Sequence, residues 1–162
     1  MTVYLERDAV VSSCGRYRYL LRRVWDFKRP RALFVMLNPS TADARVDDAT
    51  IRSCARLCRV WGYGSFEVVN LYGWRATKPR ELSGVADPIG PGNDQIVEAA
   101  IRRCDSPICA WGAHPMAEPR ADVMLRLIGR HRPAAFCLGK TKAGAPRHPL
   151  YIKSGTIPER YP

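Results

Sequence analysis

Four stretches of the chain combine amides, aromatic rings and glycines, and each follows a short apolar run. The stretches are 37–41, 70–74, 111–114 and 138–141. Amides donate and accept hydrogen bonds, and aromatic rings offer flat apolar faces. An imidazole, His148, follows soon after the last stretch. We expect a ligand site where these stretches meet in space.

Three polar residues are the main candidates, and each has a structural alternative. Asn38 precedes Pro39, and an Asn-Pro pair is also typical of a turn at a strand end. Asn70 interrupts the apolar run 68–71, where an unpartnered amide costs about 1–3 kcal/mol, so it either pairs with backbone or contacts a ligand. The proline after His148 restricts that residue to extended or turn conformations, which can aim its ring at a pocket.

The elements that must position these residues alternate along the chain. Apolar runs predict four buried strands, at 32–37, 66–71, 107–111 and 134–138. Helical periodicity predicts three helices between them: one capped at Asp47–Asp48 and ending at Gly62, one over 93–104, and one over 119–128 ending at Gly129.

This alternation predicts an α/β, three-layer fold with a central, mainly parallel four-stranded sheet and helices on both faces. The loosely alternating segment 16–25 predicts an added N-terminal edge strand or hairpin. A length of 162 residues favours a single domain over 1–162. Parallel sheets bind ligands at the carboxyl ends of their strands, which is where the four stretches lie.

Charge is the most unusual bulk property, because 26 Lys and Arg against 15 Asp and Glu give a net charge of +11. This excess favours a polyanionic partner, either a nucleic acid or a nucleotide. Two alternatives stay open. The anionic partner could be a membrane surface, or the many arginines could reflect only a GC-rich genome and no partner at all.

Other classes of site and location are disfavoured by the sequence. The longest uncharged stretch, 106–117, is too short and proline-rich for a membrane span, and the first residues lack an apolar leader, so we expect the cytoplasm and no membrane partner. The six cysteines form no CxxC pair, so we expect reduced thiols and neither a metal nor another cofactor. The sequence Gly139-Lys140-Thr141 lacks the P-loop glycine five positions earlier, at Ala134.

Several motifs resemble a known family. The segments 37–43, 61–64, 70–77, 110–112 and 148–151 resemble an uncharacterised bacterial and phage family, domain-of-unknown-function family 1643. The resemblance covers about residues 15–155 of this chain. It identifies a family and implies almost nothing about activity.

A more remote resemblance does imply an activity. In order along the chain, 37–39, 68–70, 110–112 and 148–149 are similar to the motifs of the uracil-DNA glycosylase superfamily, a three-layer α/β fold. The resemblance implies that Asn38 positions the attacking water, that Asn70 contacts the base edge, and that His148 stabilises negative charge on the departing base. The other residues expected to bind substrate are Pro39, Ser40, Tyr72, Trp74, Trp111, Gly112, Lys140, Arg147 and Tyr151.

The expected function is therefore binding of a nucleic acid, DNA rather than RNA, or of a nucleotide, with glycosylase-like hydrolysis at a modified base. Two alternatives stay open. The first is a non-catalytic nucleic-acid-binding module with a relic pocket, suggested by Ser40, Leu150 and the non-titrating Asn38. The second is an enzyme that acts on free nucleotides or nucleosides.

Overall fold

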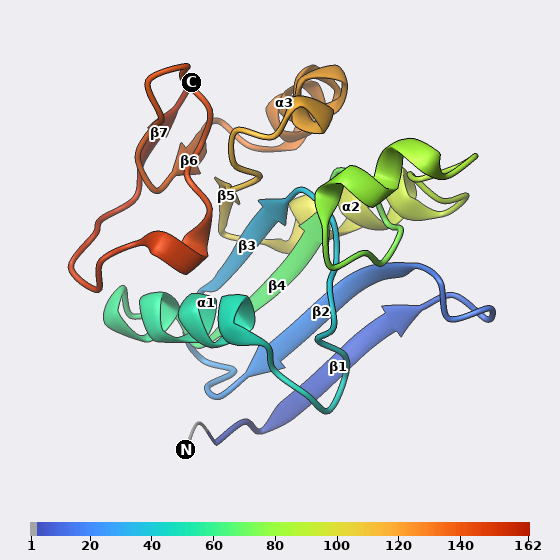
Figure 1. The fold of residues 1–162 in the computed structure, drawn as a ribbon. Coiled ribbons are helices and arrows are strands. Elements are labelled where there is room, and N and C mark those ends of the chain that lie inside the picture. Colours follow the sequence, from blue (N-terminus) through green and yellow to red (C-terminus); the bar gives the residue numbers. More distant parts are fainter. Residues whose placement is uncertain (1–2) are drawn as a thin grey trace.

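A seven-stranded mixed sheet runs through the computed structural model, which describes residues 3–162 (Figure 1). The strands are β1 (Glu6–Val11), β2 (Arg18–Val24), β3 (Arg31–Met36), β4 (Ser65–Asn70), β5 (Ser106–Cys109), β6 (Ala135–Cys137) and β7 (Glu159–Tyr161). The helices are α1 (Ala49–Val60), α2 (Asn93–Arg103) and α3 (Glu118–His131), with short 3-10 helices η1 (Pro79–Gly84), η2 (Pro115–Ala117) and η3 (Pro149–Tyr151). Among residues 3–162, no helix is long and apolar enough to cross a membrane.

The predicted parallel strands form the centre of this sheet. They lie in the order β4-β3-β5-β6, and each pairs in parallel with its neighbour. The prediction of a four-stranded sheet was nevertheless too small, because the antiparallel hairpin β1-β2 joins β4 and β7 joins β6. The N-terminal edge strand or hairpin that segment 16–25 predicts is present as this β1-β2 hairpin. The three residues of β7, Glu-Arg-Tyr, contain no apolar run that could have revealed a strand.

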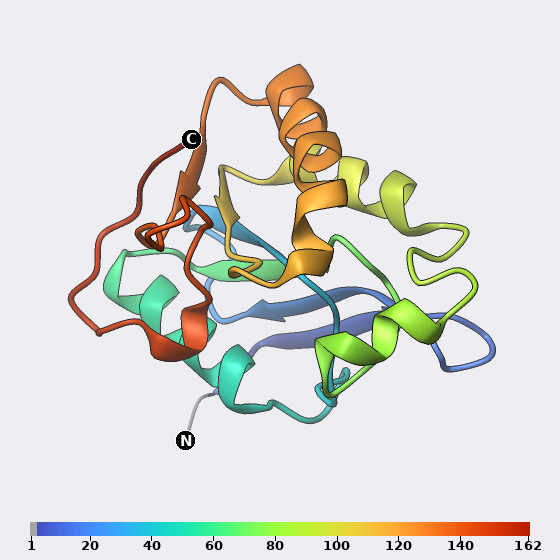
Figure 2. The same cartoon turned by 45° about the horizontal axis from the view of Figure 1, so that its top comes forward.

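Helices cover both faces of the sheet, as Figures 1 and 2 show. Alternate residues of β3 divide between two cores, because successive side chains of a strand point to opposite faces. Leu33 and Val35 pack with α2 and α3, whereas Phe34 and Met36 pack with α1. The α/β arrangement with helices on both faces is therefore present.

The ends of the helices follow local capping chemistry in two places and depart from it in a third. Asp48 caps α1 by accepting a hydrogen bond from the Ile51 N–H, and Gly62 follows the helix with a φ of +83°. The predicted end of α3 at Gly129 was wrong, since the helix continues to His131. A glycine weakens a helix by only about 1 kcal/mol, and buried Leu127 and Ile128 hold this last turn against the core.

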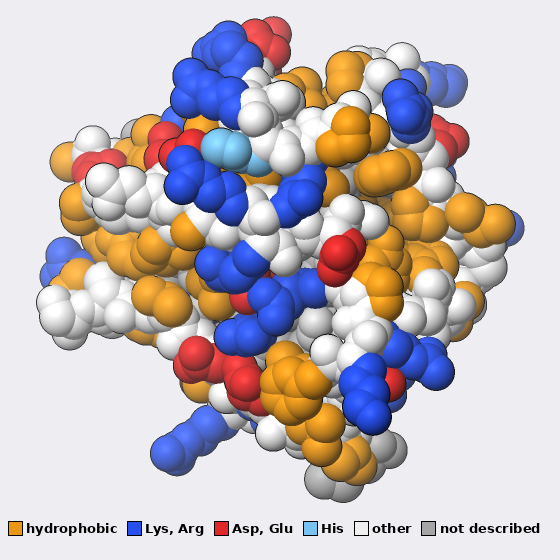
Figure 3. Space-filling view, turned by 180° about the vertical axis from the view of Figure 1, so that it is seen from behind, with side chains coloured by type: hydrophobic (Ala, Val, Ile, Leu, Met, Phe, Trp, Pro, Cys, Tyr) orange, Lys and Arg blue, Asp and Glu red, His pale blue; other side chains and the backbone are white. Residues whose placement is uncertain are grey.

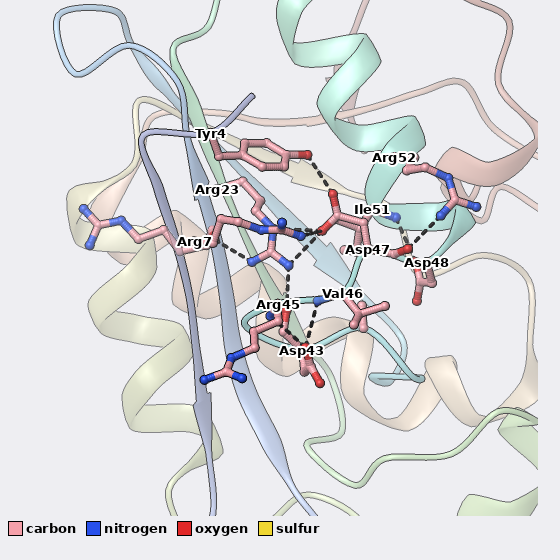
Figure 4. Close-up of polar contacts among 12 residues, drawn as sticks. Tyr4, Arg7, Arg23, Asp43, Arg45, Val46, Asp47, Asp48, Ile51 and Arg52 are labelled. Carbon is pink, nitrogen blue, oxygen red and sulfur yellow. Dashed lines mark hydrogen bonds and ion pairs between the residues drawn. The ribbon is translucent and has the colours of Figure 1, made fainter. Parts of the chain in front are cut away.

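A buried ion pair fixes the segment between β3 and α1 (Figure 4). Arg23 on β2 is fully buried, and its Nη2 lies 2.8 Å from Oδ1 of Asp47. The same guanidinium donates to the backbone carbonyl of Asp43, and Tyr4 donates its hydroxyl to Asp47 Oδ2 at 2.9 Å. These contacts hold the segment 37–48 against the sheet.

We expect Asp47→Ala to destabilise the fold by about 3–5 kcal/mol, because it leaves the buried Arg23 charge without a carboxylate. Urea denaturation measures this loss. The matched control is Asp122→Ala, since Asp122 is exposed on α3 and should change the free energy of unfolding by less than about 0.5 kcal/mol. Equal stability of the two variants would show that the ion pair does not anchor the segment.

Candidate functional site

A cavity of about 450 Å³ opens at the carboxyl ends of the parallel strands, on the face covered by α1. Its walls come from the ends of β3 and β4, the first turn of α1, the segment after β5, and η3. The structure brings seven of the predicted site residues to this cavity: Asn38, Ser40, Asn70, Trp111, Gly112, His148 and Tyr151. Three of the four predicted stretches therefore reach one cavity.

Three of the remaining predicted residues are held in other packing contacts. Pro39 is buried, and its carbonyl accepts a hydrogen bond from the Asn38 amide. Tyr72 belongs to the core on the α2 and α3 face, where its hydroxyl donates to the carbonyl of Met116. Trp74 packs edge to face on Tyr17. These three are positioned to support the strand ends rather than to line the cavity.

The two predicted cations do not line the main cavity. Lys140 is exposed, with its Nζ over the ring of Tyr161. Arg147 lines a neighbouring hollow of about 260 Å³ that it shares with His148 and Tyr151. Its Nε donates to the carbonyl of Lys140. Arg147 therefore belongs to the rim of the site, whereas Lys140 lines neither hollow.

The amide of Asn38 has a fixed orientation. Its Nδ2 donates to the carbonyl of Ala76 at 2.8 Å and to that of Pro39 at 3.1 Å. Because the nitrogen is occupied by backbone acceptors, the amide oxygen is the group left for a ligand or a water molecule. An amide oxygen accepts hydrogen bonds without titrating, so this group can orient water and cannot act as a strong base.

The side chain of Asn70 lacks protein partners. The residue is 1% exposed, and neither Oδ1 nor Nδ2 forms a hydrogen bond with any described residue. Its position at the end of β4, opposite Met36 of β3, brings it to the cavity. Of the two explanations that the sequence offered, pairing with backbone is therefore not observed. A buried amide without a partner costs about 1–3 kcal/mol, which a ligand can recover.

Two imidazoles line the cavity in equivalent local settings. His148 Nδ1 accepts the N–H of Leu150 at 3.3 Å, and His114 Nδ1 accepts the N–H of Met116 at 3.2 Å. Each histidine begins a 3-10 helix with a proline in its first turn. Since Nδ1 is an acceptor, the proton of each neutral ring lies on Nε2, which is thus a donor. The repeated His-Pro dipeptide was the signal that could have revealed His114.

Two charged residues of the cavity escaped the sequence analysis. Arg18 is 3% exposed and donates from Nη1 to the carbonyl of Ala42 at 2.7 Å. Burial lowers the pKa of Arg18 to about 10, so it stays charged at neutral pH. Asp48 was recognised only as a helix cap, yet its half-buried carboxylate also lines the cavity. Arg18 was missed because it lies in the segment 16–25, where arginines alternate with aromatic residues, a pattern that suggests solvent-exposed charges.

A separate cluster of arginines lies far from the cavity. Arg22, Arg31 and Arg103 surround the buried carboxylate of Glu67, with Arg103 Nη2 at 3.0 Å from Oε2. Glu67 lies near the start of β4 and alternates with Asn70, so it faces the α2 and α3 side. Lys and Arg also gather near the centre of the face seen in Figure 3. The net charge is therefore not confined to the cavity.

Metal ligands are not grouped in the part of the chain that the structure describes. No three His, Cys, Asp or Glu side chains of residues 3–162 lie close enough together to bind a metal ion. All six cysteines are free, and five of them are buried. Burial raises the pKa of Cys54 and Cys58 well above the usual value of a thiol, so both stay protonated.

Acid should weaken the fold through His148. Burial lowers the pKa of His148 in the folded chain below its ordinary value of 6.5. At a pH between the lowered pKa and 6.5, the unfolded chain therefore binds more protons than the folded chain. We therefore expect the melting temperature to fall as the pH drops from about 6.5 through the lowered pKa. His148→Gln should remove part of this fall, whereas Arg126→Gln, which changes an exposed residue of α3, should retain it. Thermal denaturation between about pH 7.5 and pH 5 measures both, and identical pH profiles for wild type and His148→Gln would contradict the expectation.

Comparison with known proteins gives one match. The family model described as "Protein of unknown function (DUF1643)" matches residues 18–150, a range that includes the cavity residues from Arg18 to Leu150. This match confirms the first resemblance drawn from the motifs. No curated protein and no solved structure matches the chain.

Proposed function

The chain belongs to the DUF1643 family, and we propose that its cavity binds a nucleobase-bearing ligand and hydrolyses the bond between the base and its sugar. One observation carries this proposal. The free amide oxygen of Asn38 and the free Nε2 of His148 belong to the same cavity, beside the indole of Trp111.

The proposed reaction needs a hydrogen-bond donor and an acceptor at separate points. When the glycosidic bond breaks, its electron pair goes to the base, and the sugar becomes an oxocarbenium-like cation. The hydroxyl of water then adds to the anomeric carbon, and its proton ends on the base. Nε2–H of His148 donates to the base as negative charge develops, and the Asn38 oxygen orients the water.

Aromatic groups supply the surface that a base needs. Trp111 is buried on the cavity wall and packs edge to face on Tyr161, which fixes its indole. Tyr151 is 83% exposed at the rim, with its ring 6.5 Å from the imidazole of His148. An exposed ring at the mouth can stack on a base or fill the gap left by an extruded one.

We also propose that the fold is related to that of the uracil-DNA glycosylase superfamily. The support is the placement of the motifs. Asn38, Asn70, Trp111 and His148 all reach one edge of a parallel sheet that has helices on both faces. The three antiparallel strands extend this central unit at its two sides.

A non-catalytic DNA-binding module is the second candidate function, and the arginine cluster favours it. Arg22, Arg31 and Arg103 carry three positive charges against the two carboxylates of Glu67 and Glu6, an excess of one. Such a surface can neutralise backbone phosphates of DNA even though it lies outside the cavity. This candidate requires salt-dependent binding of duplex DNA without release of a base.

Base release separates the two candidates. We expect the protein to release a base from at least one of a panel of DNA duplexes with deaminated or modified bases, or from free nucleosides or nucleotides. Asn38→Ala and His148→Gln should each slow release by about 10²–10³-fold, because each removes an oriented group. Chromatography of the released base measures the rate.

The matched control for these variants is Arg126→Gln, which changes an exposed charge on α3. Its rate should equal that of the wild type. Release that continues unchanged in both Asn38→Ala and His148→Gln would remove the mechanism. Binding of duplex DNA without release of a base would instead support the non-catalytic binding module.

A further inference from the structure

A second group of donors in the cavity lacks partners, at the end away from Trp111. We propose that Arg18, Asn70 and the first turn of α1 form a phosphate subsite, so that the ligand is a nucleotide rather than a free base or nucleoside. This inference rests on the proposed function, because it names the class of ligand for the same cavity.

Arg18 is the first element of the subsite. Its guanidinium is buried, and no described carboxylate oxygen lies within 4.0 Å of it. Nη1 donates to the carbonyl of Ala42, while the buried Nε has no partner. A buried cation is strongly destabilising unless it is paired and hydrogen-bonded. Asp48 and Asp43 act on this charge only from beyond 4.0 Å, so an anion in the cavity would be its direct partner.

Asn70 is the second element. It lies on β4, the neighbour of β2, and both of its side-chain polar atoms are buried without partners. Its Nδ2 can donate to a phosphate oxygen that also accepts from Arg18. Two buried polar side chains on adjacent strands, Arg18 with an unpartnered Nε and Asn70 with an unpartnered amide, thus line the same cavity.

The first turn of α1 is the third element. Ala49 and Thr50 line the cavity, and N–H groups in the first turn of a helix have no partner within the helix. The Asp48 carboxylate accepts a hydrogen bond from the N–H of Ile51, so the N–H groups of Ala49 and Thr50 are the ones left for a ligand. The positive end of a helix dipole together with free N–H groups favours phosphate. The Asp48 charge offsets part of this attraction.

The order of the strands gives the ligand an orientation. Arg18, Asn70 and Asn38 belong to β2, β4 and the end of β3, and Trp111 follows β5, the next strand of the sheet. Adjacent strands lie about 4.8 Å apart, so the edge from β2 to β5 spans about 14 Å. A nucleotide lying along this edge places its phosphate at Arg18, its sugar at Asn38 and its base at Trp111. The water held by Asn38 then faces the sugar, as the proposed reaction requires.

This orientation assigns Asn70 a different ligand group from the one implied by the glycosylase resemblance. There the strand-borne asparagine contacts the base edge. Here Asn70 has a buried guanidinium as its neighbour at the end of the cavity, which is a setting for an anion. The phosphate could be the terminal group of a free nucleotide or a phosphodiester of a nucleic acid strand, and both have the oxygens that Arg18 requires.

Isothermal titration calorimetry at fixed ionic strength tests the subsite. The probes are the common ribonucleosides, their 5′-monophosphates, and short oligonucleotides without a terminal phosphate. We expect a 5′-monophosphate to bind about 10- to 100-fold more tightly than its nucleoside. Arg18→Gln should abolish this difference and leave nucleoside binding in place. The matched control Arg126→Gln should preserve the difference.

Asp48→Asn provides a test of opposite sign. Asparagine caps helices as well as aspartate does, so the fold should be kept while a negative charge leaves the subsite. We expect 5′-monophosphates to bind more tightly to Asp48→Asn than to the wild type. A residue with only a structural role would not produce this gain.

Inorganic phosphate gives a readout that does not depend on the base. It should raise the melting temperature of the wild type and of Asp48→Asn, and leave that of Arg18→Gln unchanged. If Arg18→Gln fails to fold, Arg18→Lys keeps the charge and should retain a weaker preference for the monophosphate. Circular dichroism checks folding in each case.

The outcomes are distinct from those of the proposed function. Equal affinity for nucleosides and monophosphates, with no effect of inorganic phosphate, overturns the subsite even if a base is released. An Arg18-dependent preference for phosphate supports the subsite even if no base is released. Oligonucleotides that match the monophosphates, in an Arg18-dependent manner, also support the subsite and identify the strand phosphodiester as its source.

Discussion

The buried ion pair between Arg23 and Asp47 is the constraint on which the cavity depends. A fully buried guanidinium is tolerated only when its donors are occupied, and Arg23 finds acceptors at Asp47, Asp43, Asp8 and Arg22. Two of these lie in the segment that connects β3 to α1. Because Asn38 lies near the start of this segment and Asp48 at its end, the contacts of Arg23 help to hold both residues at the cavity. The hydrogen bonds from Asn38 to Ala76 and Pro39 fix the orientation of its amide.

Arg18 and Arg23 lie on the same strand and are equally buried, but their surroundings differ. Arg23 is enclosed by acceptors, whereas Arg18 has one backbone carbonyl and an open cavity. Buried polar groups in folded proteins are nearly always hydrogen-bonded. A satisfied group of this kind holds the fold together, and an unsatisfied one beside a cavity indicates the position of a ligand. Asn70 belongs to the second class.

The parts of this fold that follow from local patterns were predictable. Apolar runs locate the four central strands, and Asp48 locates the start of α1, because burial and capping are encoded by neighbouring residues. The strand β7 was missed because backbone pairing with β6, rather than an apolar pattern, creates it. Asn38, Asn70 and His148 were found because they interrupt or follow apolar runs. Arg18 was missed, since its burial depends on residues around Ala42 that are distant in sequence.

The polar groups of the cavity determine how the proposed reaction would proceed. Asn38 cannot titrate, and protonation of His148 on Nδ1 would break its hydrogen bond with the Leu150 N–H. In the proposed reaction, Asn38 and His148 would therefore act through fixed orientation and charge stabilisation rather than through proton exchange. Such catalysis requires that the ligand be held along the whole cavity, because displacement by about 1 Å costs much of the rate. In the proposed subsite, a phosphate anchored at Arg18, at the far end from Trp111, would supply that second point of attachment.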